Sequence, residues 1–509
     1  MRERVTFFHP TDTGVLPENL KRDKGGLETP VFETTREDRL TLGLDELPAE
    51  VASVLNGFSS LHVAWNSPVA YRTLEPFAAR LSPGLHVLFD PAVAGTSENP
   101  RDCSVDEVRE VLLPLIRALG LATLDETKLT IPKAISTTIT GPEGSPQPKQ
   151  FFQPLEELSY FAKWLSSEVC GAEDDACQSR AQRLQSAAGL DITYDAASKT
   201  AKVSAFWPLE KQPVSVPFSP HRRTEVGILT LGNPPNLAPD HVGVSGILTT
   251  LGEKKQPSPA LFAFPARHKL SESYFSTAFL TPTGLHPTLQ LRLSGNQPPK
   301  EDAECRPYAY LTLPKTIFAD RFQLDGELFM ASKNLTALRA TSLPVDLEAP
   351  AYTTGAWGSS ILLELAPPTS AANQAWTAEV PLHLRYLKPS KTGLESIEVP
   401  YPAVFWACSA EQGPEFSQNP FDRARVGYDT LFESDTVFWH VEPRPEQGDR
   451  LVNAISVPVL DERGSALIGV GTSLVVALGF GWVLWKLYSA VAQNGFRDTS
   501  EAAEEKKKR

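Results

Sequence analysis

The longest hydrophobic run of the chain lies close to its C-terminal end. From Gly464 to Trp485 no residue carries a charge, and about 20 apolar residues suffice for a helix to cross the hydrocarbon core of a bilayer. Trp482 and Trp485 end this run beside Lys486, as interfacial anchors do. The pattern predicts one transmembrane helix over residues 464–487.

Small residues recur inside this run at every fourth position. They are Ser465, Gly469, Ser473, Ala477 and Gly481. Small side chains at this spacing let another helix approach closely, so Gly469, Ser473, Ala477 and Gly481 are a candidate helix-packing face. Ordinary glycine enrichment in a membrane span is the alternative interpretation.

Charge around the run predicts its orientation. Basic residues dominate after it, whereas acidic residues outnumber basic ones just before it. The positive-inside rule therefore predicts a cytosolic basic tail over 488–509 and a lumenal N-terminal part. The final KKKR places Lys506 and Lys507 fourth and third from the end, as in a dilysine retrieval signal of the endoplasmic reticulum; a solubilising tail is the alternative. The first twenty residues show no apolar stretch typical of a signal peptide, which leaves the insertion route open.

The remainder of the chain divides by its pattern near residue 240. Residues 1–240 mix strand-like runs, such as DRLTLGL and LHVAWN, with helical spacing. The helical stretches are Leu47–Phe58, Val105–Leu119 and Pro154–Val169. We expect an α+β N-terminal region here.

Residues 241–460 read as short strands separated by turn signals. The clearest are TLQLRL (288–293), YAYLTL (308–313), SILLEL (360–365) and VPLHLRYL (380–387). Several such strands favour an antiparallel β-sandwich. Forty-four prolines among 509 residues also suit turn-rich β structure better than long helices.

Composition narrows the functional classes. A net charge of −13 with no basic cluster before the tail argues against nucleic-acid binding. Five cysteines without a C-x-x-C pair form no metal-binding pattern. A lumenal domain favours a bridge between Cys305 and Cys408, because each lies beside a strongly β-like run; buried small residues are the alternative. Asn334 opens the one N-x-S/T sequon, Asn334-Leu335-Thr336, a glycosylation acceptor only in the lumen.

Catalytic motifs are missing from the sequence. No Walker, nucleophile-elbow or H-E-x-x-H motif occurs, and no D-x-D pair that would hold a sugar donor. If 380–387 is one strand, Leu382, Leu384 and Tyr386 face one way and His383 and Arg385 the other. That last pair lies close enough to meet an anionic group, although a partner contact is the better interpretation. We predict no catalytic, cofactor-binding or metal-binding residues and no enzymatic activity.

One family resemblance runs through the C-terminal half. TPTGLHPTLQLRL, CRPYAYLTLPKTIFADRFQLD, VPLHLRYLKP, YPAVFWAC and SVPV follow in this order before the span. The series resembles the PIG-X family over about residues 277–487, and MRERVTF with REDRLTLGLDELP resembles the N-terminal extension of its fungal form.

The resemblance implies a non-catalytic subunit of glycosylphosphatidylinositol (GPI) mannosyltransferase I in the endoplasmic reticulum membrane. That complex adds the first mannose, from dolichol-phosphate-mannose, to glucosaminyl-phosphatidylinositol. Its partner would be a polytopic catalytic subunit of the PIG-M type. The motif residues are interpreted as structural or partner-facing: His286, Leu313, Pro314, Phe318, Asp320, Leu324, His383, Arg385 and Tyr386. A general lumenal chaperone, or a catalytic transferase, is the competing hypothesis.

Overall fold

The computed structural model describes most of the chain outside one long N-terminal segment. The described residues are 2–11, 20–23, 26–91, 138–139, 149–170, 175–219, 223–253, 257–300, 304–343, 345–368, 374–410, 416, 419–423 and 425–494. The chain forms two compact units, Met1–Tyr386 with Glu398–Ile455 and Leu387–Ile397 with Ser456–Arg509. The helix expected at 105–119 and the lysines Lys506 and Lys507 lie outside the described residues.

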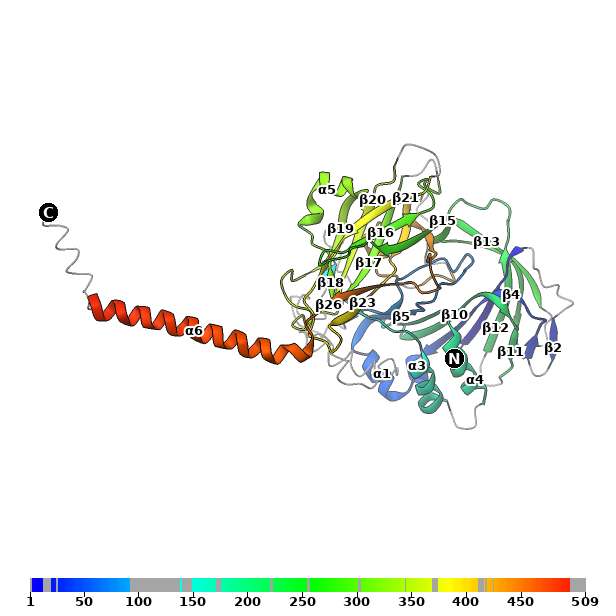
Figure 1. Cartoon of the computed structure of the whole chain (residues 1–509). Helices are drawn as coiled ribbons and strands as arrows, with labels where there is room; N and C mark the ends of the chain where they lie inside the picture. Colours follow the sequence, from blue (N-terminus) through cyan, green and yellow to red (C-terminus); the bar gives the residue numbers. More distant parts are fainter. Residues whose placement is uncertain are drawn as a thin grey trace. The chain divides into compact units, whose positions relative to one another are not determined.

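A ten-stranded sheet makes up much of the N-terminal region of the first unit (Figure 1). In spatial order its strands are β14 (Ser258–Pro265), β13 (His241–Thr250), β12 (Arg223–Leu231), β1 (Arg2–Phe8), β4 (Phe32–Gly43), β10 (Thr200–Gln212), β9 (Gly189–Asp195), β5 (Phe58–Asn66), β6 (Gly84–Pro91) and β8 (Lys149–Gln153). Neighbouring strands are antiparallel except β1 and β12, which pair in parallel from Arg2 opposite Arg223. The sheet thus brings the first strand of the chain beside strands from near residue 230.

A nine-stranded sheet follows in the sequence. In spatial order its strands are β21 (Trp376–Pro381), β16 (Thr288–Leu293), β15 (His268–Phe279), β25 (Thr436–Pro443), β24 (Ala403–Ser409), β17 (Cys305–Pro314), β20 (Gly358–Leu365), β19 (Leu335–Leu343) and β7 (Thr138–Ile139). Only β15 and β25 pair in parallel. The predominantly antiparallel, sandwich-like β fold confirms the predicted class.

Smaller elements complete the described chain. The small sheets are β11 (Ser215–Pro217) with β3 (Gly26–Glu28) and β2 (Lys21–Asp23), β18 (Ile317–Phe318) with β22 (His383–Leu384), and β23 (Leu394–Pro400) with β26 (Val452–Pro458). The helices before the C-terminal one are α1 (Ala49–Leu55), α3 (Ser159–Trp164), a π-helical turn (Leu165–Val169), α4 (Asp175–Arg183) and α5 (Glu327–Ser332). The helices expected at Leu47–Phe58 and Pro154–Val169 are therefore present but shorter.

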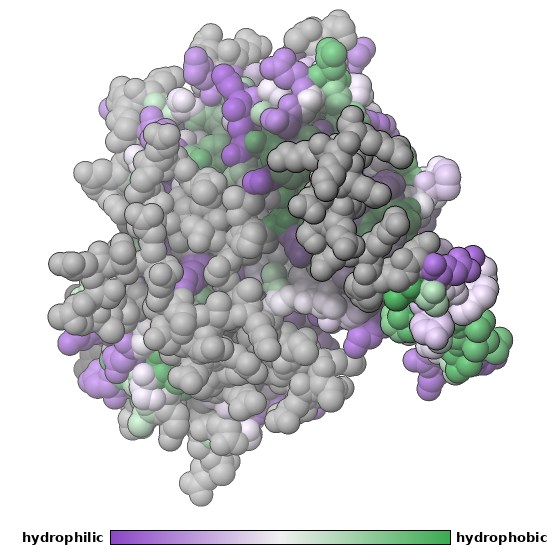
Figure 2. All heavy atoms as spheres, turned by 90° about the vertical axis from the view of Figure 1, so that its left-hand side faces the viewer, coloured by the Kyte–Doolittle hydropathy of each residue, from purple (hydrophilic) through white to green (hydrophobic). Residues whose placement is uncertain are grey.

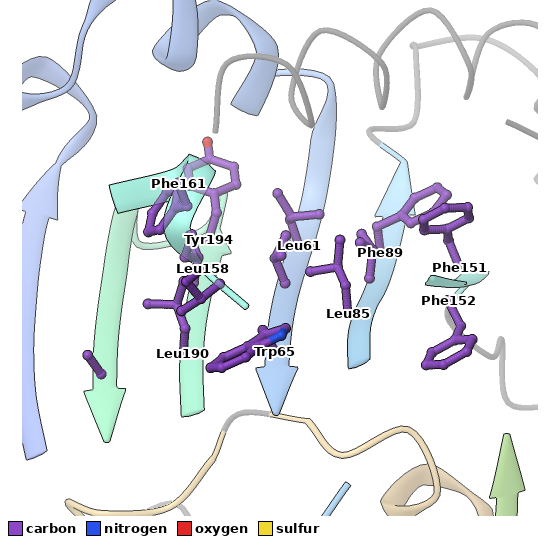
Figure 3. Packing of buried hydrophobic residues seen from close by; sticks show 14 of the residues in the cluster. Leu61, Trp65, Leu85, Phe89, Phe151, Phe152, Leu158, Phe161, Leu190 and Tyr194 are labelled. Carbon is purple, nitrogen blue, oxygen red and sulfur yellow. The ribbon is translucent and has the colours of Figure 1, made fainter. Parts of the chain in front are cut away.

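The main apolar core lies on one face of the ten-stranded sheet. Figure 3 shows Leu61 of β5, Leu85 of β6 and Leu190 of β9 projecting toward a common layer. Phe161 of α3 packs onto the same cluster, and each of these side chains is at most 3% exposed. Burying one such side chain contributes about 1.5–3 kcal/mol, so the short helices are held by this face rather than by their own length.

A second core is aromatic and joins the two large sheets. The Phe405 ring stacks on Tyr428 with a centroid distance of 4.6 Å. The hydroxyl group of Tyr310, on β17, donates a hydrogen bond of 3.2 Å to Gln150 Oε1, on β8. Both tyrosines are at most 1% exposed, so this polar contact is made within the core and links strands of different sheets.

One expected strand differs from the structure. The run at 380–387 ends as β21 at Pro381, and His383–Leu384 then pairs with β18 in a separate sheet. Leu382 is fully buried, Arg385 is 7% exposed, and Tyr386 is 67% exposed. The alternating faces predicted for this run are therefore wrong, because the chain leaves one sheet for another at Leu382.

The second unit contains the C-terminal helix α6 (Glu462–Asn494). Its beginning is tied to residues 387–397: Ser390 N donates to Leu460 O, and Glu462 N donates to Ser390 O, both at 3.0 Å. The helix is long and apolar enough to cross a membrane, and none of its apolar window is buried by the described residues. Its leucine, valine, phenylalanine and tryptophan side chains are exposed. In the space-filling view of Figure 2, both hydrophilic and hydrophobic residues are visible among the coloured atoms at the margins of the face.

Candidate functional site

Several of the motif residues meet around the small β18–β22 sheet. Phe318 pairs with His383, and the Leu384 N–H donates to Leu285 O at 3.0 Å, which brings the turn carrying His286 alongside. His286 Nδ1 lies 3.1 Å from His383 Nδ1. We call His286, Phe318, Gln323, His383 and Arg385 the histidine-pair surface.

Hydrogen bonds fix the arrangement of this surface. His383 Nε2 lies 2.9 Å from Gln323 Oε1; because that oxygen only accepts, Nε2 carries the proton. The Arg385 guanidinium lies 4.4 Å from the centroid of Phe318 and donates to Ala349 O at 2.8 Å. Burial, and then the neighbouring His286, lowers the pKa of His383. His383 is therefore neutral at pH 7.

The other motif residues divide into structural and exposed ones. Leu313 and Leu324 are buried, and Asp320 Oδ1 accepts the Phe322 N–H at 2.9 Å, which closes a turn. Leu285, Phe322 and Tyr386 are each more than half exposed. Exposed aromatic and aliphatic groups beside a polar cluster are typical of a protein-binding surface.

A cleft of about 380 Å³ lies elsewhere in the first unit. We call it the ion-pair cleft, after the charged residues that line it: Glu37, Arg39, Asp191, Lys202, Arg267, Asp422, Arg423 and Asp429. They come from β4, β9 and β10, from the residue just before β15, and from positions 422, 423 and 429. No motif in the sequence indicates this site, because its members are scattered from residue 37 to residue 429.

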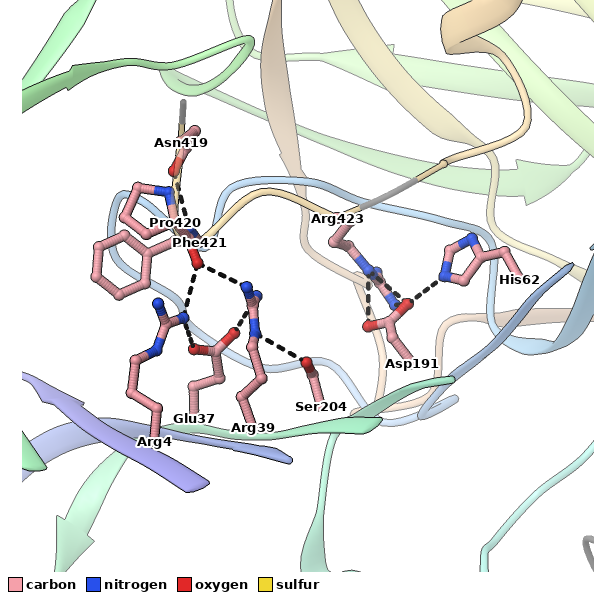
Figure 4. Close-up of polar contacts among 10 residues, drawn as sticks. All are labelled: Arg4, Glu37, Arg39, His62, Asp191, Ser204, Asn419, Pro420, Phe421 and Arg423. Carbon is pink, nitrogen blue, oxygen red and sulfur yellow. Dashed lines mark hydrogen bonds and ion pairs between the residues drawn. The ribbon is translucent and has the colours of Figure 1, made fainter. Parts of the chain in front are cut away.

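Ion pairs in the cleft are close and bidentate (Figure 4). Arg423 donates through Nε and Nη2 to the Asp191 carboxylate at 2.9–3.1 Å. His62 Nε2 lies 2.9 Å from the same carboxylate. Burial alone would raise the pKa of Asp191, but the Arg423 charge and these hydrogen bonds outweigh it and bring the pKa to about 2. Asp191 is therefore ionised throughout the physiological range.

A second network in the cleft holds the main chain at Pro420. Arg4 and Arg39 donate to the Pro420 carbonyl oxygen at 2.7 and 2.6 Å, and both also pair with Glu37 at 2.7 Å. The Phe421 ring packs edge-on against Phe8, 5.5 Å between centroids. These contacts fasten residues 419–423 to β1 and β4 of the ten-stranded sheet.

Asp422 differs from its neighbours because no Lys or Arg among the described residues forms an ion pair with it. Its Oδ1 lies 4.0 Å from His268 Nε2. Burial, followed by the charge of Asp429, raises the pKa of Asp422 to about 7. Burial and the nearby Arg267 lower the pKa of His268 to about 3, so the histidine stays neutral and does not stabilise the carboxylate.

The remaining predicted site residues lie apart from both clusters. Cys305 and Cys408 stand opposite each other on β17 and β24 and form a disulfide, as do Cys170 and Cys177. Asn334 is exposed and donates through Nδ2 to Thr377 O at 2.7 Å. Gly469, Ser473, Ala477 and Gly481 lie on exposed parts of α6. In the described part of the chain no three His, Cys, Asp or Glu side chains gather as metal ligands.

Comparison with known proteins identifies the family. A model described as PIG-X / PBN1 matches residues 282–488, which include the histidine-pair surface. Protein PBN1 of Gibberella zeae is 49% identical over the full length of both chains. Protein pbn1 of Neurospora crassa is 47% identical over 99% of this chain and 98% of its own. Protein pbn1 of Emericella nidulans is 37% identical over 98% and 97%.

One solved structure aligns with most of this chain: the C-terminal domain of the Streptococcus pyogenes antigen I/II-family protein AspA. The alignment covers 89% of this chain and 99% of that domain, with 10% sequence identity. Its TM-score is 0.13, too low to assign a fold. The full-length similarity to the fungal proteins is decisive by contrast. The described residues include one helix that could anchor the chain in a membrane, and the chain belongs to the PIG-X/PBN1 family, whose members take part in GPI-anchor biosynthesis.

Proposed function

We propose that the chain is a non-catalytic stabilising subunit of GPI mannosyltransferase I. It would be required for addition of the first mannose from dolichol-phosphate-mannose to glucosaminyl-phosphatidylinositol. Membership of the PIG-X/PBN1 family is the observation that carries this proposal. The partner would be the polytopic catalytic subunit of the PIG-M type.

Three features support a lumenal position for the first unit in the endoplasmic reticulum. The two disulfides, Cys170–Cys177 and Cys305–Cys408, are the kind of bond that persists in an oxidising compartment. The basic tail after α6 favours the cytosolic side, and Lys506 and Lys507 would serve there in retrieval. Asn334 is exposed, and one of the two Nδ2 hydrogens donates to Thr377 O. The other hydrogen is available to be replaced by a glycan.

The membrane helix and the histidine-pair surface are the candidate contacts with the catalytic subunit. On α6, no atom lies within 4 Å of a side chain added at Gly469 or Gly481, so a partner helix has room to approach there. On the first unit, Tyr386 and Phe322 are 67% and 65% exposed beside the histidine pair. Exposed aromatic groups of this kind commonly supply interface contacts.

Depletion of the protein tests the proposal through the glycolipid that accumulates. We expect glucosaminyl-phosphatidylinositol to build up without its first mannose, and wild-type protein to restore mannosylation. The purified protein alone should transfer no mannose. Normal mannosylation after depletion would overturn the proposal, and transfer by the purified chain would make it a catalytic transferase.

A broader chaperone role is the second candidate. The observation that favours it is the ten-stranded sheet, formed by strands between Arg2 and Pro265, outside the residues 282–488 that the family model matches. A general chaperone would co-purify with several membrane or vacuolar clients. Recovery of the mannosyltransferase alone would count against this role.

A further inference from the structure

The ion-pair cleft contains an amide group whose donor lacks a partner. Asn66, at the end of β5, is 4% exposed and lines the cleft. Arg423 Nη1 donates to Asn66 Oδ1 at 3.1 Å. Because a guanidinium only donates, the oxygen must face Arg423. The amide nitrogen is then left buried without a hydrogen bond in the structure, which costs about 1–3 kcal/mol unless something else accepts from it.

The arginines of the cleft are already engaged, which disfavours a phosphate or carboxylate ligand. Arg423 is committed to Asp191 and Arg39 to Glu37. Arg267 donates to the carbonyl oxygens of Asp429 and Glu433 at 3.2 and 3.1 Å. An anion among these arginines would have to displace the buried pairs, and separating one leaves an uncompensated charge. Lys202 also lines the cleft, but its side chain is exposed, so water and salt screen its charge.

The groups that remain suit an uncharged, hydroxylated ligand. Asn66 offers a donor, and the Asp422 carboxyl group can donate or accept, since its pKa is about 7. Phe77 and Phe206 also line the cleft, with ring centroids 5.3 Å apart. Half-buried aromatic rings pack against the C–H face of a sugar while neighbouring polar groups bind its hydroxyls. A volume of about 380 Å³ lies within the range of small-molecule sites.

We propose that the ion-pair cleft binds an uncharged sugar residue, with Asn66 and Asp422 bonded to its hydroxyls and Phe77 and Phe206 against its ring. This inference does not depend on the subunit role. If the cleft binds no sugar, the family assignment and the proposed partner contacts still hold. If the chain is not a subunit of the mannosyltransferase, the proposal that the cleft binds a sugar still stands.

Saturation-transfer NMR on the full-length protein tests the proposal. The chain is kept in a detergent without a sugar head group, because a maltoside would compete. The probes are methyl α-D-mannopyranoside and methyl α-D-glucopyranoside. Inorganic phosphate has no carbon-bound protons, so its binding is followed by broadening of its phosphorus-31 signal. We expect saturable transfer to at least one glycoside and no broadening of the phosphate signal.

Two variants locate the binding. Asn66→Asp keeps an oxygen toward Arg423 but removes the donor, and should weaken binding at least tenfold. Gly189→Ala narrows the cleft without a clash, because the added Cβ meets Phe206 Cβ at 3.7 Å and Asn66 Oδ1 and Trp65 O at 3.8 Å, which are ordinary contacts; it should weaken binding at least tenfold. Asn453→Asp, at a buried asparagine bonded to Thr277, is the matched control and should bind as wild type.

Thermal unfolding identifies any variant that fails to fold. If one of the two cleft variants is unfolded, the other still tests the proposal. The proposal is overturned if neither glycoside binds saturably, if binding survives both cleft substitutions in folded protein, or if phosphate binds and the glycosides do not. The last result would show an anion site instead.

Discussion

Arg423 and Asp191 form a bidentate ion pair across 232 positions of the sequence, with nitrogen–oxygen distances of 2.9–3.1 Å. Asp191 belongs to the ten-stranded sheet, whereas Arg423 lies within the residues matched by the PIG-X / PBN1 model. The N-terminal region is therefore joined to the family-specific region by a charged contact, in addition to the aromatic core.

Removing one partner of this pair should be costly. The Asp191 side chain is 17% exposed in the pair, and Arg423→Met removes its guanidinium partner while His62 stays beside it. Loss of one member of a buried pair costs about 3–5 kcal/mol of unfolding free energy. Arg450→Met is the control, since Arg450 and Glu156 pair at 2.8 Å but are about half exposed, and such pairs contribute below about 1 kcal/mol. Thermal unfolding of the detergent-solubilised chain measures both, and equal losses would contradict the assigned role.

Asp422 should make the protein less stable as pH rises from about 4 to 7. Its pKa is about 7 when folded against about 3.9 when unfolded, so the folded state holds a proton that the unfolded state has released. The stability from that proton is fully present below about pH 4, is lost progressively as pH rises from 4 to 7, and changes little above 7. Asp422→Asn should therefore be more stable than wild type at pH 8, by up to about 4 kcal/mol of unfolding free energy, and show little difference at pH 4.

The neighbouring histidines require that this measurement be made as a difference between two proteins. Burial lowers the pKa of His268 to about 3 and that of His440 well below its usual range. Their neutral forms stabilise the fold above pH 6.5, and this contribution is lost on acidification, but it is common to wild type and Asp422→Asn. A stability difference between the two proteins that does not grow as pH rises from 4 to 7 would rule out the protonated Asp422.

The two disulfides should differ in their contribution to stability. Cys305 and Cys408 are 103 positions apart, and Cys170 and Cys177 are seven apart. Loop-closure entropy predicts a loss of roughly 4–5 kcal/mol when the first is replaced by serines and about 2–3 kcal/mol for the second. Unfolding midpoints of the two double variants give the comparison. A larger loss at Cys170–Cys177 would show that chain entropy is not the deciding term.

Bulky residues on the small-residue face of α6 should lower the amount of catalytic subunit. Gly469→Leu with Ala477→Leu would keep a partner helix from approaching, while insertion of the span remains intact. Val475→Leu with Val483→Leu has the same spacing but lies about 240° around the helix, and serves as the control. Immunoblotting of membranes measures the subunit, and unchanged levels in the first variant would make α6 a plain anchor.

Local patterns were enough to predict much of the β structure and the C-terminal helix. In Thr288–Leu293 the three leucines are buried and Arg292 is exposed. One face of that strand packs on the core, so apolar and polar residues alternate along its sequence. The long uncharged run gave α6 for a similar reason, since its length and composition alone decide the outcome.

Long-range pairings explain what could not be predicted. Nothing near Arg2 indicates its parallel pairing with Arg223, and the break after Leu382 depends on β18 lying ready to pair with His383. The ion-pair cleft is the extreme case: Asp191 and Arg423 each read as an ordinary surface charge until the fold brings them together. Only the motifs around His286 and His383, which the family resemblance singled out, pointed to a surface in advance.

The level of the polytopic mannosyltransferase after depletion of this protein tests the central claim most directly. The subunit role predicts that the catalytic subunit, followed by immunoblotting of membranes during depletion, declines while an unrelated polytopic protein of the endoplasmic reticulum keeps its level. It also predicts that the two proteins co-purify from detergent. A catalytic subunit that stays at its normal level and purifies without this chain would contradict the account.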